Sequence, residues 1–440
     1  MEKITRIVCA GMMMSLFFDV AFAQRLTIAT VRNAYISQMQ DLASNFEKEN
    51  PDIELNWIFF GEKFLRQRVR ADIATGRGQY DIVLVNSYEA PIWAREGWLV
   101  SLNDLPASYD IEDIFPSVRS GLSINGNLYA APFHAEGFMV MYRKDLMKKA
   151  GLTMPKTPTW DFIRKAAKAI TDKTDDDNQI YGICLRGKAG WSENVAILTA
   201  MANSFGAKWF DLDWNPQFDS NAWKETLNFY LNMMEESGHP KAFLNGFSEN
   251  FKLFQKGKCG IWIDTTAAAP SLTGWKYSKI HKDIGFALAP DKELGKRANG
   301  LWTLNLVIPV SSKKIEIAKK FIGWTTSKEY LALLGYKEGW GNVPPSARIS
   351  LYENPEYAKF PFAWITAESI NSTDPTEPTI DPVPYIGAHF VAIPEYQSIA
   401  TDVAQQFSAA LAGKISAEDA LKNAQTLTVR IMKKIGYIKQ

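Results

Sequence analysis

Cysteine is scarce in this chain of 440 residues, which holds three in all. No CxxC pair and no cluster of cysteine with histidine occurs, which argues against a zinc site and against thioredoxin-like chemistry. Cys184 and Cys259 both stand in apolar, strand-like runs. In an oxidising compartment the two can form a disulfide, and two buried free thiols are the equal alternative.

An excess of charge of one sign is also missing. The chain has 49 lysines and arginines against 48 aspartates and glutamates, a formal net charge of +1. This balance gives no electrostatic reason to expect nucleic acid or an anionic membrane as a partner. After residue 23 no apolar run reaches the roughly 18 residues that a membrane-spanning helix needs. Internal repeats are absent as well, which argues against a repetitive adhesive protein.

Motifs for catalysis and for cofactors are lacking. The stretch Gly182–Ala189 resembles the Walker A phosphate-binding motif, but Ala189 occupies the position at which a serine or threonine must bind magnesium. The charged run Thr171–Asn178 lacks the glycine and terminal glutamate of a calcium loop. No triad, HExxH or GxSxG pattern occurs, so we expect neither an enzyme nor a cofactor or metal. An exported glycoside hydrolase using Glu136 and Asp264 as its carboxylate pair is the enzyme alternative.

The first residues carry the pattern of a secretory signal. Lys3 and Arg6 flank an apolar run from Ile7 to Phe18, and Ala21-Phe22-Ala23 follows. A basic start, a short apolar segment and small residues at a cleavage site predict a signal peptide over residues 1–23 and export to the periplasm. The apolar run is too short to cross a bilayer. A buried N-terminal helix is the alternative.

Predicted strands and helices alternate along the rest of the chain. The first part reads as the strands Arg25–Val31, Ile53–Phe59 and Tyr80–Val85 with the helices Ile36–Lys48 and Glu62–Thr75 between them. Alternation of this kind predicts a parallel sheet covered by helices. The alternation of helices and strands continues with Trp160–Ile170, Ile180–Leu185, Trp223–Ser237 and Cys259–Ile263. The sequence therefore predicts an α/β protein of two lobes with a cleft between them.

Several motifs resemble a known family. The segments Asn125–Pro132, Tyr142–Leu146, Lys149–Leu152 and Phe254–Cys259 resemble family 1 extracellular solute-binding proteins of ABC importers. A narrower likeness, to the periplasmic sorbitol- and mannitol-binding branch, lies in Leu185–Trp191, Gly260–Asp264, Glu338–Trp340, Asn342–Pro345, Pro382–Tyr385 and Phe390–Pro394. Two stretches depart from that branch. His134-Ala135-Glu136-Gly137 replaces an expected Tyr-Gly-Glu-Ser, and Asn299–Leu306 holds one tryptophan instead of two or three.

The resemblance implies a fold, a function and partners. The fold is that of periplasmic binding proteins, with residues 24–134 and 302–340 in the first lobe and residues 135–301 and 341–440 in the second. The implied function is binding of a polyol, sorbitol or mannitol, between the lobes, which close by hinge motion. A monosaccharide or an oligosaccharide is the alternative ligand. The implied partners are the membrane permease subunits of an ABC transporter, and the chain is expected to be a monomer.

A polyol buries many hydroxyl groups, each of which needs a hydrogen-bond partner, while aromatic rings can cover its C–H edges. In open α/β sheets such ligands lie beyond the carboxyl ends of the strands. Glu136 and Asp264 are the firmest candidates, because a carboxylate at the end of an apolar strand needs a partner. Ordinary capping, ion-pairing or core packing is the alternative role for each of the others. The candidate ligand-binding residues are Asn33, Tyr88, Glu89, His134, Glu136, Arg186, Lys188, Trp191, Asp264, Trp302, Asn305 and Trp340.

Overall fold

The computed structural model of the chain describes residues 23–171, 179–274, 278 and 280–439. The predicted signal peptide lies outside these residues except for Ala23, and so does most of the charged run that begins at Thr171. Within the described part of the chain, no helix combines the length and the apolar character that crossing a bilayer demands.

The first lobe is built on strands that run in parallel. Strand β1 (Gln24–Thr30) pairs with β2 (Ile53–Phe59) and with β3 (Ile82–Asn86). Helices α1 (Ala34–Glu49) and α2 (Glu62–Thr75) connect them, as the alternation predicts. The lobe continues through α3 (Glu89–Arg95), η1 (Ala107–Tyr109), η2 (Ile111–Asp113), α4 (Pro116–Leu122), β4 (Ser123–Ile124) and β5 (Asn127–Leu128). Asn125 and Gly126, between β4 and β5, both have positive φ, of 51° and 77°, as a tight hairpin turn requires.

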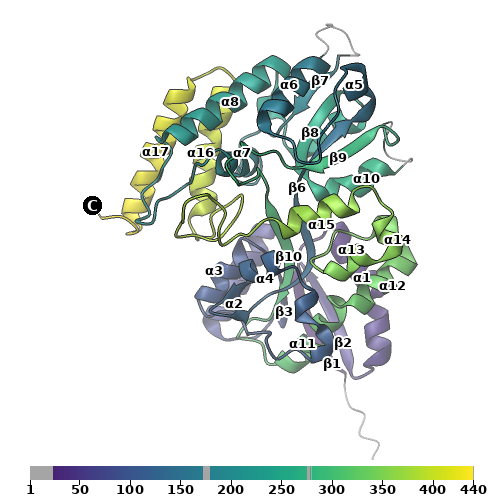
Figure 1. Cartoon of the computed structure of the whole chain (residues 1–440). Coiled ribbons are helices and arrows are strands. Elements are labelled where there is room, and N and C mark those ends of the chain that lie inside the picture. Colours follow the sequence, from purple (N-terminus) through teal and green to yellow (C-terminus); the bar gives the residue numbers. More distant parts are fainter. Residues whose placement is uncertain (1–22, 172–178, 275–277, 279, 440) are drawn as a thin grey trace, which may run out of the picture.

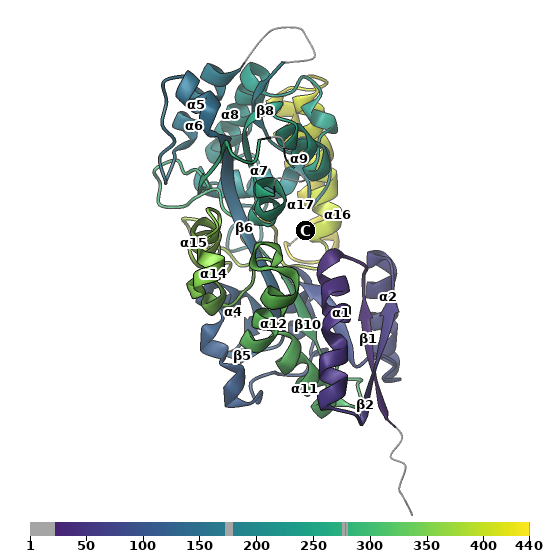
Figure 2. The ribbon, with the colours of Figure 1, turned by 90° about the vertical axis from the view of Figure 1, so that its right-hand side faces the viewer.

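One long strand joins the two lobes. Strand β6 (Ala131–Arg143) pairs through residues 131–137 with β10 (Leu301–Val307) and through residues 138–143 with β8 (Cys259–Thr265) and β9 (Ile284–Leu288). The sheet order is β2-β1-β3-β10-β6-β8-β7, with β9 also on β6 and β7 spanning Tyr181–Cys184. Figures 1 and 2 show β6 running from one lobe into the other. Gly137 marks the crossing, where an added Cβ would lie 2.8 Å from Ser369.

Helices cover the sheet of the second lobe. Strand β8 lies beside β7, and the helices of the chain's last part pack against α7 and α8 (Figure 1). The helices between β6 and β10 are α5 (Lys144–Lys149), α6 (Trp160–Ile170), α7 (Asn194–Ser204), α8 (Asn221–Ser237), η3 (Ala242–Leu244), α9 (Phe247–Gln255), η4 (Thr266–Ala268) and α10 (Ala269–Thr273). Those after β10 are α11 (Ile315–Thr325), α12 (Lys328–Glu338), η5 (Trp340–Asn342), α13 (Ile349–Glu353), α14 (Pro355–Ala358), α15 (Ala363–Asn371), α16 (Tyr396–Leu411) and α17 (Ala417–Lys434).

The chain segment after η5 keeps contact with the first lobe. Arg348, which is 1% exposed, donates to the carbonyl of Tyr109 at 2.7 Å and to the carboxylate of Asp113 at 3.1 Å. Helix α15 then packs against β6, and α16 and α17 belong to the second lobe. The lobe boundary expected at residue 340 stays a prediction, and the contacts of Arg348 favour a later one.

Most of the aromatic side chains serve the core. Fully buried tryptophans include Trp93, Trp160, Trp209, Trp223 and Trp262. Large rings bury much apolar surface and dominate core energetics. The high tryptophan content therefore reflects packing first, and only a few of these rings are left to contact a ligand.

Candidate functional site

A cavity of about 410 Å³ lies where the two lobes meet, within the size range of small-molecule sites. Residues of β6 and β10, the N-terminal turns of α1, α7 and α9, the end of β8 and the loop before α16 all reach it. Its walls combine aromatic rings with a few charged groups. The lining residues are Tyr35, Glu136, Phe138, Arg186, Trp191, Ser192, Glu193, Ala196, Phe247, Thr265, Ala267, Trp302, His389 and Phe390.

Arg186 carries the positive charge of the cavity wall. It follows β7 and donates to both oxygens of Asp264, at 2.9 Å and 2.5 Å, and to the carbonyl of Ser192 at 2.6 Å. Burial alone would lower the pKa of Arg186, but the neighbouring carboxylates outweigh it, Asp264 most of all, and hold that pKa above its ordinary value. The guanidinium is thereby fixed as a rigid donor toward the cavity.

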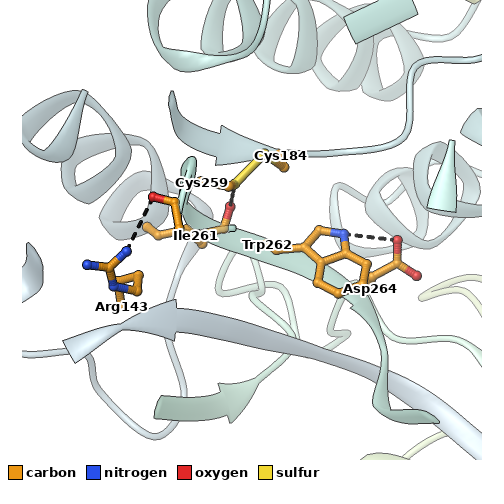
Figure 3. The surroundings of a disulfide bond; sticks show 7 residues. Arg143, Cys184, Cys259, Ile261, Trp262 and Asp264 are labelled. Atoms are coloured by element: carbon orange, nitrogen blue, oxygen red, sulfur yellow. Dashed lines mark hydrogen bonds between the residues drawn. A yellow bond between two sulfur atoms is a disulfide. The ribbon is translucent and has the colours of Figure 1, made fainter. Parts of the chain in front are cut away.

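Asp264 pairs with Arg186 on the side away from the cavity and does not line the cavity. Its side chain is fully buried, and it also accepts hydrogen bonds from the indole of Trp262 at 3.2 Å and from the backbone of Thr265 at 2.8 Å. Figure 3 shows the contact between Trp262 and Asp264 at the end of β8. With its oxygens engaged in this way, Asp264 is positioned to orient Arg186 and not to accept from a ligand.

Glu193 lies on the wall next to Arg186, at 3.9 Å from its guanidinium. It precedes α7, and its carboxylate accepts from the backbone N–H of Phe247, at the start of α9, at 3.1 Å. An N-terminal helix turn presents free N–H groups and a partial positive charge, which suits a carboxylate.

Glu136 enters the cavity from β6 and is held by a histidine. Nε2 of His134 lies 3.0 Å from the Glu136 carboxylate, and the His134 ring stacks on Tyr35 with 4.5 Å between centroids. Burial, and to a smaller extent Glu136, raise the pKa of Tyr35, so its hydroxyl stays protonated. The Glu136 side chain is 18% exposed, whereas that of His134 is 2% exposed. Glu136 is therefore the member of this group that can reach a ligand.

Aromatic rings form the apolar wall. Trp302 on β10 lies opposite Glu136 in the strand pairing, and its ring centroid is 6.2 Å from that of Trp191. His389 packs 5.9 Å from Trp302, and burial lowers the pKa of His389 to about 3. His389 is therefore neutral at ordinary pH and acts as a polar ring without charge. Such a wall can cover the C–H edges of a polyhydroxy compound.

Four of the predicted ligand-binding residues line the cavity: Glu136, Arg186, Trp191 and Trp302. Two more, His134 and Asp264, lie directly behind the lining and hold Glu136 and Arg186. Which of these residues bind a ligand stays a prediction.

The remaining candidates do not line this cavity. Asn33 caps α1 by accepting from the N–H of Ile36 at 2.8 Å. Tyr88 donates to the carbonyl of Ile393 at 2.8 Å. Glu89 is buried, pairs with Arg66 and faces a smaller neighbouring cavity of about 250 Å³.

The last three candidates lie elsewhere. Lys188 is exposed, and Asn305 is fully buried within β10, where it donates to the carbonyl of Val85 at 3.4 Å. Trp340, in η5, packs against Tyr336 of α12. Exposure to solvent, burial within a strand and packing against a neighbouring ring therefore account for the positions of Lys188, Asn305 and Trp340.

Sequence reasoning missed part of the lining. Tyr35, Glu193, Phe247, His389 and Phe390 come from helix starts and from a loop, and the rule of strand ends does not reach them. His389 stands in a proline-rich stretch without regular structure, and such loops often carry functional residues. Two signals pointed to this loop: histidine is rare in the chain, with four residues, and Phe390 begins the motif Phe390–Pro394 that resembles the polyol-binding branch.

Cys184 and Cys259 form a disulfide that joins β7 to β8 (Figure 3). Arg186 follows β7, and Asp264 lies near the end of β8. The covalent link therefore connects the two strands that position the central ion pair. As for metal ions, the described residues contain no group of three or more side chains arranged to hold one.

Comparison with known proteins identifies the family to which this chain belongs. The family model described as bacterial extracellular solute-binding protein matches residues 32–332. The chain is 47% identical over 417 residues to a mannitol-binding protein of Pseudomonas aeruginosa, covering 95% of each chain. A crystal structure of an ABC transporter solute-binding protein from Agrobacterium vitis with bound D-mannitol matches with a TM-score of 0.84 and 58% identity, over 95% of this chain and 100% of that one. A ribitol complex from Agrobacterium radiobacter shares the fold, with a TM-score of 0.77 and 24% identity over 93% and 99% of the two chains. This chain belongs to the family of bacterial extracellular solute-binding proteins.

Proposed function

We propose that this chain is the substrate-binding component of an ABC importer and that it binds a six-carbon alditol, D-mannitol or its epimer sorbitol, in the cavity between its lobes. The observation that carries the proposal is the lining of that cavity. It brings Arg186, Glu136 and Glu193 together with the Trp191–Trp302 ring pair around one cavity. The high identity to a mannitol-binding protein, over nearly the whole of both chains, supports the same ligand.

The chemistry of the wall suits an acyclic polyol. Each ligand hydroxyl loses water on burial and needs a partner, and hydrogen bonds to charged groups contribute about 1.5–3 kcal/mol each. The guanidinium donates, the two carboxylates accept, and the rings cover the apolar edges of the carbon chain. Because Asp264 and Ser192 hold Arg186 in place, little side-chain entropy is lost when the ligand arrives.

A glycoside hydrolase is disfavoured by the same geometry. The carboxylate pair considered for it was Glu136 with Asp264, but Asp264 is fully buried and occupied by Arg186. A hydrolase of this kind needs both carboxylates at the scissile bond. We therefore propose a binding function without hydrolysis.

The partners and the place of action complete the proposal. A polyol binder of an importer delivers its ligand to membrane permease subunits, so the chain is proposed to work in the periplasm as a monomer after removal of residues 1–23. The basic, apolar and small-residue pattern of that segment supports export.

Thermal-shift and calorimetric titration with D-mannitol, D-sorbitol, ribitol and maltose tests the ligand. At about 100 times its dissociation constant, a bound alditol should stabilise the fold by about 2.7 kcal/mol. Trp302→Ala should weaken the binding of the preferred alditol by about tenfold or more, since it removes a wall of the cavity. Trp340→Ala is the matched control, because Trp340 lies outside the cavity. A response to maltose with none to any alditol would exclude the polyol and leave the importer role standing.

A further inference from the structure

The positive and negative charges of the residues around the cavity do not cancel. Among the lining residues that the structure describes, Arg186 is the one cation, whereas Glu136 and Glu193 are both carboxylates. Arg186 is already engaged with both oxygens of Asp264, behind the wall, at 2.9 Å and 2.5 Å. The positive charge that Arg186 brings is therefore largely used before any ligand arrives.

Glu193 has other compensation. Its carboxylate lies 3.9 Å from Arg186 and accepts from the N–H of Phe247 at the start of α9, a helix of nine residues. The helix dipole and the N–H group together stabilise one negative charge at that position. Glu193 is in this way partly neutralised within the protein.

Glu136 has weaker compensation. Arg186, already engaged by Asp264, attracts it through space, and the hydrogen-bond contact given for its carboxylate within the described part of the chain is Nε2 of His134, whose Nδ1 is buried without a hydrogen-bond partner. His389, the other histidine at the cavity, is neutral, since burial lowers its pKa to about 3.

From this arrangement we infer that the cavity selects alditols by charge: it accepts neutral alditols and amino-alditols, whose ammonium group lies beside Glu136, and it rejects aldonic acids. The inference rests on the proposed function and deepens it by naming which derivatives of the polyol enter. An ammonium group adds positive charge beside Glu136, whereas a ligand carboxylate would face Glu136 and Glu193, whose side chains are only 18% and 28% exposed. Like charges so placed oppose binding strongly.

The symmetry of mannitol makes the test sharp. D-Mannitol has a twofold axis, so replacing either terminal hydroxyl gives the same compound. D-Mannitol, 1-amino-1-deoxy-D-mannitol and D-mannonate then differ at one terminal carbon, which carries a hydroxyl, carries an ammonium or is itself a carboxylate at pH 7. Each charged compound can enter the cavity in two directions, which place its charge at opposite ends, so its measured dissociation constant is that of the more favourable direction.

Isothermal titration of the three compounds against the mature protein measures the selection. The amino-alditol is expected to bind at least as tightly as D-mannitol, and D-mannonate about 100-fold more weakly than the amino-alditol or worse. Equal dissociation constants for the ammonium and carboxylate compounds, or tighter binding of D-mannonate, would overturn the inference.

Single substitutions test which carboxylate causes the selection by charge. Glu136→Gln should reduce the ratio of the two dissociation constants by about tenfold, while Glu193→Gln should reduce it by less than about threefold, because the α9 terminus already compensates Glu193. Glu225→Gln on the exposed side of α8 is the control and should leave the ratio unchanged. A larger effect of Glu193→Gln than of Glu136→Gln would contradict the assignment to Glu136.

Failure of this inference is distinguishable from failure of the proposed function. If D-mannitol and D-sorbitol both fail to bind the unmodified protein, the proposed function is wrong. If D-mannitol binds and the charge of the terminal group makes no difference, the function stands and the charge selection is wrong.

Discussion

Arg186 is the residue on which the polar wall of the cavity depends. Its side chain is 11% exposed and makes hydrogen bonds to Asp264 on one side and to Ser192 on the other. A buried cation is stable only while its partners remain, because the desolvation cost is otherwise uncompensated. The proposed binding group is thus also part of the folded framework, and we expect a change in its partners to affect both stability and affinity.

Asp264→Asn is expected to destabilise the fold by about 3–5 kcal/mol, as breaking a buried ion pair does. The amide keeps the shape of the carboxylate but leaves Arg186 without its counter-charge, so the affinity for D-mannitol should fall together with stability. Urea unfolding and calorimetry on the same samples measure both quantities. Asp161→Asn, which removes an exposed contact to Lys292, is the control and should change stability by less than about 1 kcal/mol. If the variant lost binding while keeping its full stability, Asp264 would have to contact the ligand directly.

At the scale of elements, regular alternation made the first lobe predictable. The predicted strand Ile53–Phe59 and helices Glu62–Thr75 and Trp160–Ile170 are confirmed with the same bounds. Periodic patterns and helix caps involve residues close together in the chain, as where the Thr159 side chain caps α6 by accepting from the N–H of Phe162.

Longer-range features were harder to predict. Strand β6 has 13 residues, but Pro132 and Gly137 interrupt its pattern, so the sequence alone does not indicate a strand of this length. Pro132 lies where the pairing of β6 with β10 shifts register, and Gly137 lies where β6 changes partners between the lobes. The cavity residues His389 and Phe390 lie more than 80 residues from Trp302 in the sequence, and only the tertiary fold brings the three rings together.

The link between β7 and β8 gives a prediction at this scale. The disulfide encloses 75 residues, and restricting an unfolded loop of that length is worth about 4 kcal/mol in the chain-entropy model. The double variant Cys184→Ala with Cys259→Ala should therefore unfold at a lower urea concentration, and the unmodified protein treated with a thiol reductant should behave alike. Binding of D-mannitol at low temperature should survive, since neither cysteine lines the cavity. Identical unfolding curves for the oxidised and reduced protein would contradict the stabilising role.

For the whole molecule, the decisive feature is how the lobes are joined. Asn299 lies where the chain returns to the first lobe, just before β10, and it is 6% exposed. Its side-chain oxygen accepts from the N–H of Phe138 on β6 at 2.7 Å, and its amide donates to the carbonyl of Ser369 on α15 at 2.6 Å. One side chain therefore joins the three segments that pass between the lobes. A hinge needs such a fixed point about which the lobes can turn.

Asn299→Ala tests that joint. The change removes the acceptor of the N–H groups of Phe138 and Gly300, whereas the carbonyl of Ser369 still accepts from the hydroxyl of Thr373 at 2.9 Å. Each buried N–H left without a partner costs about 1–3 kcal/mol. We expect a loss of about 3 kcal/mol in the free energy of unfolding, together with weaker binding of D-mannitol, because a looser joint populates the binding-competent arrangement less. Asn228→Ala on the exposed side of α8 removes a hydrogen bond of 2.8 Å to Lys224 and is the control, with little effect expected on either quantity. Urea unfolding with and without D-mannitol, and small-angle scattering of the free protein, would show whether the lobes have become more mobile. Equal behaviour of the two variants would mean that the lobes are held together elsewhere, and the packing of α15 against β6 would then have to supply the joint.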